Sequence, residues 1–383
     1  MQGFRLSHED AHSVCDGGSS AAFWVLDGHG GDGAAGFCAP ELAREFRDEL
    51  LAGGLPSDAR LEQGFGAVDE RHRASLGEGS SKASGASAGG VLVAQQSDGS
   101  YSLKLVCCGD VCGFVLRSPS EEEASAASLS IRNPPHLGQD HAVDHQWPLV
   151  VATVPHRPDH PAEMARIKAA GGGVSASDPP RLEDSLTVSR ALGDFEFKSD
   201  GALPAAEQKL SCVPDVHEVS GLRPGSLCLL GCCELFRALP GASAGGLVRE
   251  RLAREPKADL GDLASGLLRA GLRMKCRGDM TLMIVSLVEG TDWASSPPEM
   301  QSFEKVDEKE LAGLPEDTSR QYLAFLRRAG FPAEPSGCSS CGRWVLGMSR
   351  CACREAVYCS KHCQKKAWKD HKLKCAAVLQ KAG

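Results

Sequence analysis

The feature that most constrains this chain is the distribution of its cysteines. Of 17 cysteines in 383 residues, seven lie between residues 338 and 375, and the other ten are spread over the rest. The polar N-terminus (MQGFRLSHEDAH) does not have the apolar stretch of a secretory signal peptide. We therefore expect a reducing compartment, the cytoplasm or the nucleus, where clustered cysteines are more often metal ligands than disulfides.

Charge divides the chain at the same place. Residues 338–383 contain ten Lys or Arg and two acids, a formal +8, whereas the rest of the chain carries −16. A composition of 42% hydrophobic and 24% charged residues is typical of a globular chain. No apolar run reaches the about 18 residues of a membrane-spanning helix. We expect an acidic globular region joined to a small basic region, with no membrane partner.

The hydrophobic pattern of residues 1–288 predicts an α+β domain. Short apolar runs indicate strands at 21–30, within 89–117, at 226–231 and at 281–287. Amphipathic stretches indicate helices at 38–51, 161–170, 244–254 and 259–271. Strands that follow one another as hairpins, with the helices grouped between them, favour antiparallel or mixed sheets over a parallel βαβ fold.

Two polar segments interrupt this pattern. Residues 118–147 are rich in Ser, Glu, Pro and His, as expected of a surface insertion. Residues 289–336 are predicted to be an acidic linker that contains a short helix at 317–329.

The C-terminal region, residues 337–376, contains four closely spaced pairs of soft metal ligands. The pairs are Cys338 and Cys341, Cys351 and Cys353, Cys359 and Cys363, and His371 and Cys375. The last pair is spaced to share one helix face. Eight such ligands are the number that two tetrahedral Zn²⁺ sites require. About 40 residues bury too little apolar surface to fold alone, so the metal would supply the free energy of folding. The alternative, a reduced tail without fixed structure, is disfavoured by the regular pairing.

This spacing resembles the MYND zinc-finger family over residues 338–375. The resemblance implies that the pairs interleave, so that one zinc ion is held by Cys338, Cys341, Cys359 and Cys363. The other zinc ion would be held by Cys351, Cys353, His371 and Cys375. Here the second pair is C-x-C, whereas the family normally has C-x-x-C, which would place a ligand at Arg350.

The finger is predicted to bind protein. The resemblance implies a groove for proline-containing peptides at Gln364 and Trp368. A basic region could instead bind nucleic acid. However, seven thiolates and two zinc ions reduce its net charge to about +5, and no series of aromatic residues for base stacking is present. Nucleic acid is therefore the disfavoured partner.

Several short motifs follow one another in the acidic region. They are MQGFRLSHEDAH (1–12), FWVLDGHGG (23–31), SGASAGG (84–90), CCGDVCGFVL (107–116), HRPDHPAEMARIKAAGGGV (156–174) and LTVSRALGDFEFK (186–198). Each motif alone is weak evidence for a function, because an acidic pair is usually a solvated surface feature and an Asp-Gly-His-Gly segment is usually a turn. The series in this order resembles the metal-dependent protein phosphatase family (type 2C) over residues 1–288, which implies a β-sandwich flanked by helices.

The resemblance also implies a chemistry. Two hard cations bridged by hydroxide hydrolyse phosphate esters, and Mg²⁺ or Mn²⁺ takes oxygen ligands. Arg5 would hold the phosphoryl oxygens as a bidentate fork, and His29 would protonate the Ser or Thr leaving oxygen. The metal-site residues that the resemblance implies are Glu9, Asp10, Asp27 and the carbonyl of Gly28.

Two carboxylates that hold the second ion in the family are replaced here. Cys233, in the segment LLGCCELFRAL, and Gly278, in CRGDMT, stand where aspartates are expected. A thiol is a soft ligand that matches Mg²⁺ or Mn²⁺ poorly, and Arg237 adds positive charge nearby. Asp110 matches an acid that the family uses near an accessory metal, but the same arginine disfavours that ion.

The replaced ligands suggest a degenerate serine/threonine phosphatase domain that binds phosphoproteins or partner proteins with little turnover. One Mg²⁺ or Mn²⁺ would still bind, weakly. The alternative is an active phosphatase in which Glu234 or Asp279 substitutes as a ligand, although a displacement by one residue in an extended segment turns a side chain to the opposite face. A pure scaffold is a third reading. Because the sequence begins at its first motif, the strand that precedes this motif in the family is expected to be missing.

Overall fold

The computed structural model describes most of the N-terminal region and part of the C-terminal region. The described residues are 1, 8–77, 84–118, 129–137, 149–288, 339–340, 349–351, 356–358, 361–373 and 375. They fall into two compact units. The first comprises Glu9–Leu267 and Met280–Met300, and the second comprises Met1–His8, Leu268–Asp279 and Gln301–Gly383.

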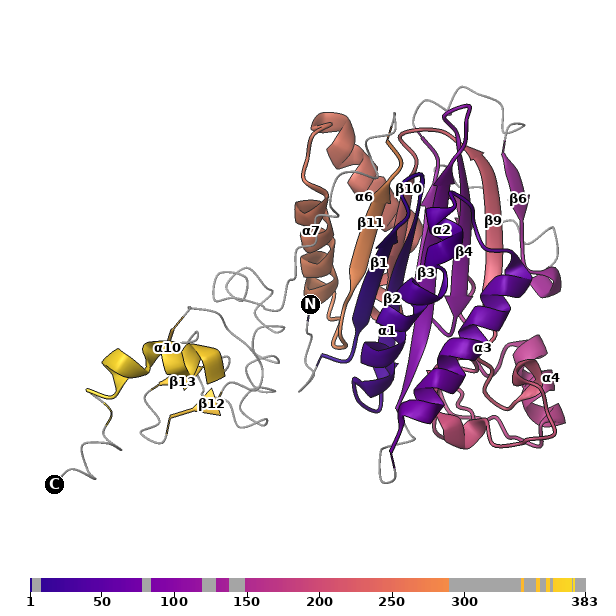
Figure 1. The fold of residues 1–383 in the computed structure, drawn as a ribbon, viewed down its shortest axis with the longest axis horizontal. Helices are drawn as coiled ribbons and strands as arrows, with labels where there is room; N and C mark the ends of the chain where they lie inside the picture. Colours follow the sequence, from indigo (N-terminus) through magenta and orange to yellow (C-terminus); the bar gives the residue numbers. More distant parts are fainter. Residues whose placement is uncertain are drawn as a thin grey trace. The chain divides into compact units, whose positions relative to one another are not determined.

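The first unit is built around two antiparallel sheets (Figure 1). The larger sheet has the order β1 (Ala11–Asp16), β2 (Ser20–His29), β3 (Gly85–Gln95), β4 (Tyr101–Cys108), β9 (Asp215–Leu222) and β6 (Ser130–Arg132), with β8 (Leu192–Gly193) paired to β3. The smaller sheet has the order β11 (Leu282–Ser286), β10 (Leu227–Gly231), β5 (Cys112–Leu116) and β7 (Leu149–Ala152). The expected α+β class and the antiparallel pairing are confirmed.

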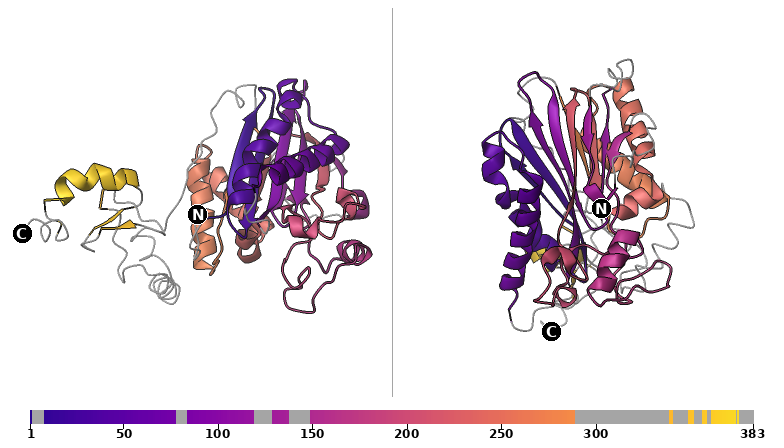
Figure 2. Two further views of the ribbon diagram at one scale, coloured as in Figure 1. Left: turned by 60° about the horizontal axis from the view of Figure 1, so that its bottom comes forward. Right: turned by 90° about the vertical axis from the view of Figure 1, so that its right-hand side faces the viewer.

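Helices cover the outer faces of both sheets. Those of the first unit are α1 (Gly33–Glu45), α2 (Arg47–Leu51), α3 (Asp58–Ser75), α4 (Pro161–Ala169), α5 (Cys233–Ala238) and α6 (Gly241–Arg254), while α7 (Leu260–Arg273) spans the boundary between the units. Figure 2 shows α1 and α3 on one side of the sheets and α6 on the other. Two glycines let α6 approach β5, because a Cβ on Gly241 or Gly245 would lie 2.2 Å from the Phe114 ring or 2.5 Å from Leu116.

The alternation of side chains along β2 separates two cores. Trp24 and Leu26 belong to the core beneath α1 and α3, whereas Val25 belongs to the core between the sheets. The Trp24 ring lies 5.8 Å from both the Phe46 and the Phe65 ring. A slip of one residue would exchange these two faces, so the cores fix the register of β2 and the position of the residues at its end.

The structure changes two expectations about local structure. The helix expected at 38–51 begins at Gly33 and is interrupted after Glu45. The first turn of this helix is stabilised from outside, because Ser84 Oγ accepts the Ala34 N–H at 3.2 Å. This N–H is one of the donors that a first helical turn cannot pair within the helix. Part of the segment expected as a surface insertion, 118–147, is instead the edge strand β6, whose Arg132 pairs with Asp58 and Glu218.

The finger region of the second unit contains a short hairpin followed by a helix. Strand β12 (Ser349–Arg350) pairs with β13 (Val357–Tyr358), and α10 (Lys361–His371) follows. The linker predicted at 289–336, with its short helix, lies outside the described residues. In the described parts of both units, no helix combines the length and apolar character that crossing a bilayer requires.

Candidate metal centres

Three potential metal ligands meet at one end of the first unit. Asp27 lies in β2, Asp110 lies in the turn between β4 and β5, and Cys233 is the first residue of α5. One ligand atom from each lies within 4.8 Å of the other two. The structure therefore brings Cys233 to Asp27, where the replaced aspartate was expected.

Ser87 connects the two acids of this group, Asp27 and Asp110. Ser87 in β3 lies opposite Asp27 in the sheet register. Its Oγ donates to Asp110 Oδ1 at 2.9 Å and accepts the backbone N–H of Asp110 at 3.2 Å. The preceding Gly109 has φ +108°, and a Cβ there would lie 2.2 Å from Ser87 Oγ. The turn thus requires glycine to hold the acid in this position.

Cys233 is in contact with Arg237. The Nη2 of Arg237 donates to Cys233 Sγ at 3.2 Å. Burial raises the pKa of the Cys233 thiol far above its ordinary value, and Asp110 adds to this effect, while Arg237 opposes it. The thiol is therefore protonated at neutral pH unless a metal ion takes the place of the proton.

The segment around Glu234 differs from the extended form considered from the sequence. The segment that starts at Cys233 is helical, so Glu234 is rotated by about 100° from it and not turned to an opposite face. The Oε1 of Glu234 lies 3.5 Å from Arg237 Nη1. Within the described residues, the ligand group at this site contains Asp27, Asp110 and Cys233 and does not include Glu234. Asp279 is buried, with 8% of its surface exposed.

The remaining predicted metal-site residues lie around the start of β1 and the end of β2. Thr281 Oγ1 donates to Asp10 Oδ2 at 2.6 Å. A Cβ on Gly28 would lie 2.2 Å from the backbone oxygen of Glu9, so only glycine lets the two segments approach this closely. Arg5, predicted to hold phosphoryl oxygens, lies outside the described residues.

His29 at the end of β2 is oriented by Asp194, a residue whose role the sequence did not indicate. Its Nε2 lies 2.6 Å from Oδ2 of Asp194, which is 1% exposed. Burial lowers the pKa of His29, but the hydrogen bond and charge of Asp194 outweigh it and raise the pKa overall, with further contributions from Asp110 and Glu9. A Cβ on Gly85 would lie 2.0 Å from Asp194 Oδ2, so glycine is required beside this pair.

A buried ion pair fixes the loop that carries Asp194. Asp69 in α3 accepts the Gly193 N–H at 2.7 Å and lies 2.8 Å from Lys198 Nζ. The same ammonium donates to the Ala191 carbonyl at 2.8 Å. Asp194 itself has φ +49°, a conformation that ordinary residues adopt only when their surroundings impose it. The motif SRALGDFEFK thus includes both the residue that orients His29 and the lysine that anchors the loop.

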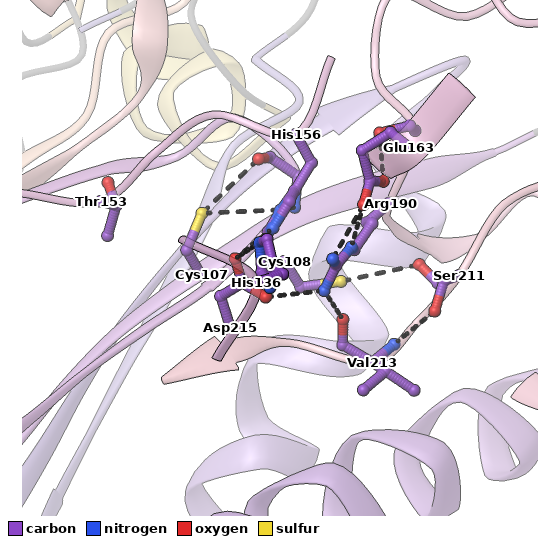
Figure 3. Close-up of polar contacts among 12 residues, drawn as sticks. Cys107, Cys108, His136, Thr153, His156, Glu163, Arg190, Ser211, Val213 and Asp215 are labelled. Carbon is purple, nitrogen blue, oxygen red and sulfur yellow. Dashed lines mark hydrogen bonds and ion pairs between the residues drawn. The ribbon is translucent and has the colours of Figure 1, made fainter. Parts of the chain in front are cut away.

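A second polar cluster lies around Asp215, at the start of β9 (Figure 3). Arg190 Nη1 lies 2.9 Å from Asp215 Oδ1, and Arg190 Nη2 lies 2.8 Å from Glu163 Oε1. Both His136 and His156 approach Asp215 Oδ2, at 3.1 and 3.0 Å. Burial alone would raise the pKa of Glu163, but Arg190 and Arg166 lower it to about 2. A cavity of about 240 Å³ lies beside this cluster.

This cluster stabilises the fold and is not a catalytic triad. Cys107, His156 and Asp215 follow one another as in a thiol-histidine-acid triad, but Cys107 Sγ is 4.0 Å from His156 Nδ1. That nitrogen already accepts the Gly109 N–H at 3.1 Å, and burial raises the pKa of Cys107 well above its ordinary value. A protonated, buried sulfur is not a nucleophile. The cluster therefore ties the 156–190 region to β9.

The finger contains a second group of three ligands, all of the soft kind. One ligand atom each from Cys351, His371 and Cys375 lies within 4.8 Å of the others, and the two sulfurs are 3.5 Å apart. These are three of the four ligands expected for the second zinc, and the donor set fits Zn²⁺. Helix α10 ends at His371, so Cys375 is not on the same helix face as expected, yet the chain returns it to the site.

The other predicted residues of the finger are described only in part. Cys363, expected at the first zinc, is buried in α10. Gln364 and Trp368 lie four residues apart on the same helix, and Trp368 is 38% exposed. Four expected zinc ligands lie outside the described residues: Cys338, Cys341, Cys353 and Cys359.

Comparisons with known proteins agree with these observations. A family model for protein phosphatase 2C matches residues 1–280, and a model for the MYND finger matches residues 338–375. A probable protein phosphatase 2C from Caenorhabditis elegans is 29% identical over 301 residues, which cover 76% of this chain and 73% of that protein. Protein phosphatase 1A from Mus musculus is 27% identical over 360 residues, covering 88% and 84%.

Solved structures show the same fold. A phosphatase from a pathogenic strain of Toxoplasma gondii aligns with a TM-score of 0.62 at 22% identity, covering 75% of this chain and 91% of that one. A sex determining protein of Caenorhabditis elegans aligns with a TM-score of 0.57 at 20% identity, covering 77% and 65%.

Proposed function

Since the chain belongs to the protein phosphatase 2C family and carries a MYND finger, we propose that its phosphatase domain binds phosphoproteins or partner proteins with little or no turnover. The observation that carries this proposal is the position of Cys233 beside Asp27 and Asp110. The family normally uses Mg²⁺ or Mn²⁺, and these ions take oxygen ligands. A protonated thiol in contact with an arginine does not fit the second of two such ions.

The retained residues fit the binding of a phosphoryl group better than its hydrolysis. Asp10, Asp27 and the Gly28 carbonyl suit one hard ion, which would attract the phosphoryl oxygens when bound. His29, oriented by Asp194, can donate a hydrogen bond to the same group. Activation of a water nucleophile by two ions requires a second complete site, and that site has lost its carboxylates at Cys233 and Gly278.

Hydrolysis of a phosphopeptide in Mn²⁺ tests this proposal. The wild type is expected to hydrolyse it no faster than Asp27→Asn, whereas Cys233→Asp, which restores a hard ligand, is expected to be faster than both. A wild-type turnover of about 1 s⁻¹ or more, in the range of ordinary enzymes, that Asp27→Asn abolishes would overturn the proposal.

The second candidate is an active phosphatase that uses a displaced acid as its missing ligand. Its support is the sequence, in which Glu234 directly follows Cys233 and Asp279 directly follows Gly278. Calorimetry separates the two candidates. Under this alternative, Glu234→Gln or Asp279→Asn weakens Mn²⁺ binding at least tenfold, whereas under the first proposal both variants bind Mn²⁺ as the wild type does.

For the finger, we propose binding to a proline-containing peptide at Gln364 and Trp368. The exposed ring of Trp368 on α10 supports this proposal, because aromatic side chains are the surfaces on which proline-rich segments dock. Nucleic acid remains the disfavoured partner, because seven thiolates and two zinc ions reduce the net positive charge of the finger. The proposed location, cytoplasm or nucleus, rests on the abundance of cysteines in the sequence.

A further inference from the structure

We propose that Asp27, Asp110 and Cys233 form a site for a thiophilic divalent cation of the Zn²⁺ class, in place of the second of the two hard ions that the family normally uses. This inference deepens the proposed function and rests on it, since it names the ion that the altered site would take. It is separate from the two zinc sites of the finger.

The spacing of the three ligand atoms suits one ion. Bonds of 2.0–2.2 Å to oxygen and 2.3 Å to sulfur place the ligands of a tetrahedral zinc ion roughly 3.5 Å apart. The three atoms here all lie within 4.8 Å of one another, so small side-chain rotations bring them to these distances. Three protein ligands also leave one position open, where a water molecule or a phosphoryl oxygen could bind.

The kind of ligand decides which ion binds. A thiolate favours zinc and other soft or borderline ions, whereas Mg²⁺ and Mn²⁺ bind it poorly. The incoming ion displaces the proton of Cys233 to solvent and forms a bond to its sulfur. Two carboxylates and one thiolate then carry a charge of −3, which a divalent ion and the guanidinium of Arg237 balance. With one divalent ion bound the site is therefore neutral, and the charge of Arg237 is balanced by its ligands.

Arg237 is also placed to stabilise the metal-bound sulfur. Its Nη2 donates to Cys233 Sγ at 3.2 Å, and hydrogen bonds to ligating atoms orient them and tune the metal. Asp110 is held in the same way, by the 2.9 Å hydrogen bond from Ser87. Cys233 and Asp110 are therefore each held by a partner before the ion arrives.

Cobalt binding to the full chain, with its finger loaded with zinc, tests this proposal. Co²⁺ bound to a thiolate gives a charge-transfer absorption that Co²⁺ bound to carboxylates does not. The wild type is expected to show this band and to bind one ion more than Cys233→Ser, which should lose the band and at least tenfold in affinity. The matched variant Cys233→Asp should keep the ion, lose the band and gain affinity for Mn²⁺.

Exchange of cobalt into the finger would contribute the same band to all variants, so the difference between the wild type and Cys233→Ser isolates the phosphatase domain. Identical spectra and equal metal content in these two proteins would overturn the inference. Thermal unfolding of each variant shows that the comparison is made between folded proteins.

The same samples separate this inference from the proposed function. A cobalt-thiolate band together with slow phosphopeptide hydrolysis supports both. The band together with rapid hydrolysis in Zn²⁺ or Co²⁺ upholds the metal site and overturns the claim of little turnover. Rapid hydrolysis in Mn²⁺ without the band overturns both.

Discussion

The phosphatase domain and the finger each bring three potential metal ligands together, but their surroundings differ. Around Asp27, Asp110 and Cys233 lies a fold with two clusters of 22 and 17 buried residues. Around Cys351 and its partners, the buried residues in the described part of the finger are few, and most are cysteines: Cys351, Ala356, Tyr358, Cys363 and Cys375.

This difference determines what each site can lose. The buried apolar area of the phosphatase domain stabilises that domain by itself, so a residue such as Cys233 can replace an acid there without loss of the fold. In the finger, the free energy of metal binding is the free energy of folding. A change of ligand in the phosphatase domain therefore alters chemistry, whereas a change of ligand in the finger removes the structure.

The largest expected effect is the complete loss of the finger when its metal is removed. A strong zinc chelator should unfold residues 338–375 and leave the phosphatase domain folded, because the described part of the finger has few buried residues and a unit of this size depends on its metal for folding. NMR spectra before and after chelation measure this as a collapse of amide dispersion confined to the finger. His371→Ala should give the same collapse without a chelator. Dispersion of the finger signals that survives chelation would contradict the comparison.

The second effect concerns the buried polar cluster of the phosphatase domain. Arg190→Met keeps most of the side-chain volume but removes the guanidinium that pairs with Glu163 and Asp215. Loss of one partner of a buried ion pair typically lowers the free energy of unfolding by about 3–5 kcal/mol. Urea unfolding of the domain measures this loss, and the finger should keep its zinc. The matched control is Arg254→Met, whose pair with Glu250 is exposed on α6 and is worth less than about 1 kcal/mol.

The third effect is a loss of stability at low pH that is caused by protonation of Glu163. Its pKa falls from 4.5 to about 2 in the folded domain, so its ionised form is favoured by folding. This contribution is fully present above pH 4.5 and is lost as the pH falls toward 2. At about 1.4 kcal/mol per tenfold change in acid strength, it amounts to roughly 3 kcal/mol. Unfolding measured between pH 6 and 2 in wild type and Glu163→Gln checks this, because the variant should have the flatter profile.

The resemblance to the phosphatase family rests on short local motifs, and it made the residues of the candidate metal site predictable. Asp27 and His29 stand in one glycine-rich segment directly after an apolar run, and β2 places them at the end of a strand as expected. The role of Cys233 was implied by the resemblance to the phosphatase family, and the apolar run before it ends, as β10 does, at Gly231. Apolar runs indicate where strands end, and residues at or just beyond those ends are the ones that a pattern can locate.

Pairs that join distant segments could not be predicted in this way. His29 and Asp194 are 165 positions apart, and Asp69 and Lys198 are 129 apart. Charged residues of this kind are usually exposed, and nothing in the local pattern marks a buried pair. The contact between Cys233 and Arg237 did have a signal, because a spacing of four places two residues on one helix face. The sequence placed the charge of Arg237 nearby but did not indicate the short helix α5 that makes the contact.

The fourth effect is small and separates the two metal clusters directly. Cys233→Ala and Asp27→Asn should change the free energy of unfolding of the phosphatase domain by no more than about 1 kcal/mol. Both residues are partly exposed, and removal of one carboxylate relieves repulsion from Asp110. Cys375→Ala, the matched change in the finger, should unfold the finger completely. A loss above about 3 kcal/mol in the Cys233 or Asp27 variant would show that this cluster also supports its fold.

The smallest effect on stability is expected at Trp368, and it distinguishes a binding residue from a structural one within the finger. Because its side chain is 38% exposed on α10, Trp368→Ala should leave the zinc content unchanged and alter finger stability by about 0.5 kcal/mol. Affinity for proline-containing peptides should fall at least tenfold, as measured by NMR titration, while the exposed neighbour Lys369→Ala serves as the control. Loss of zinc from the Trp368 variant would instead assign this ring to the support of His371, whose ring lies 6.0 Å away.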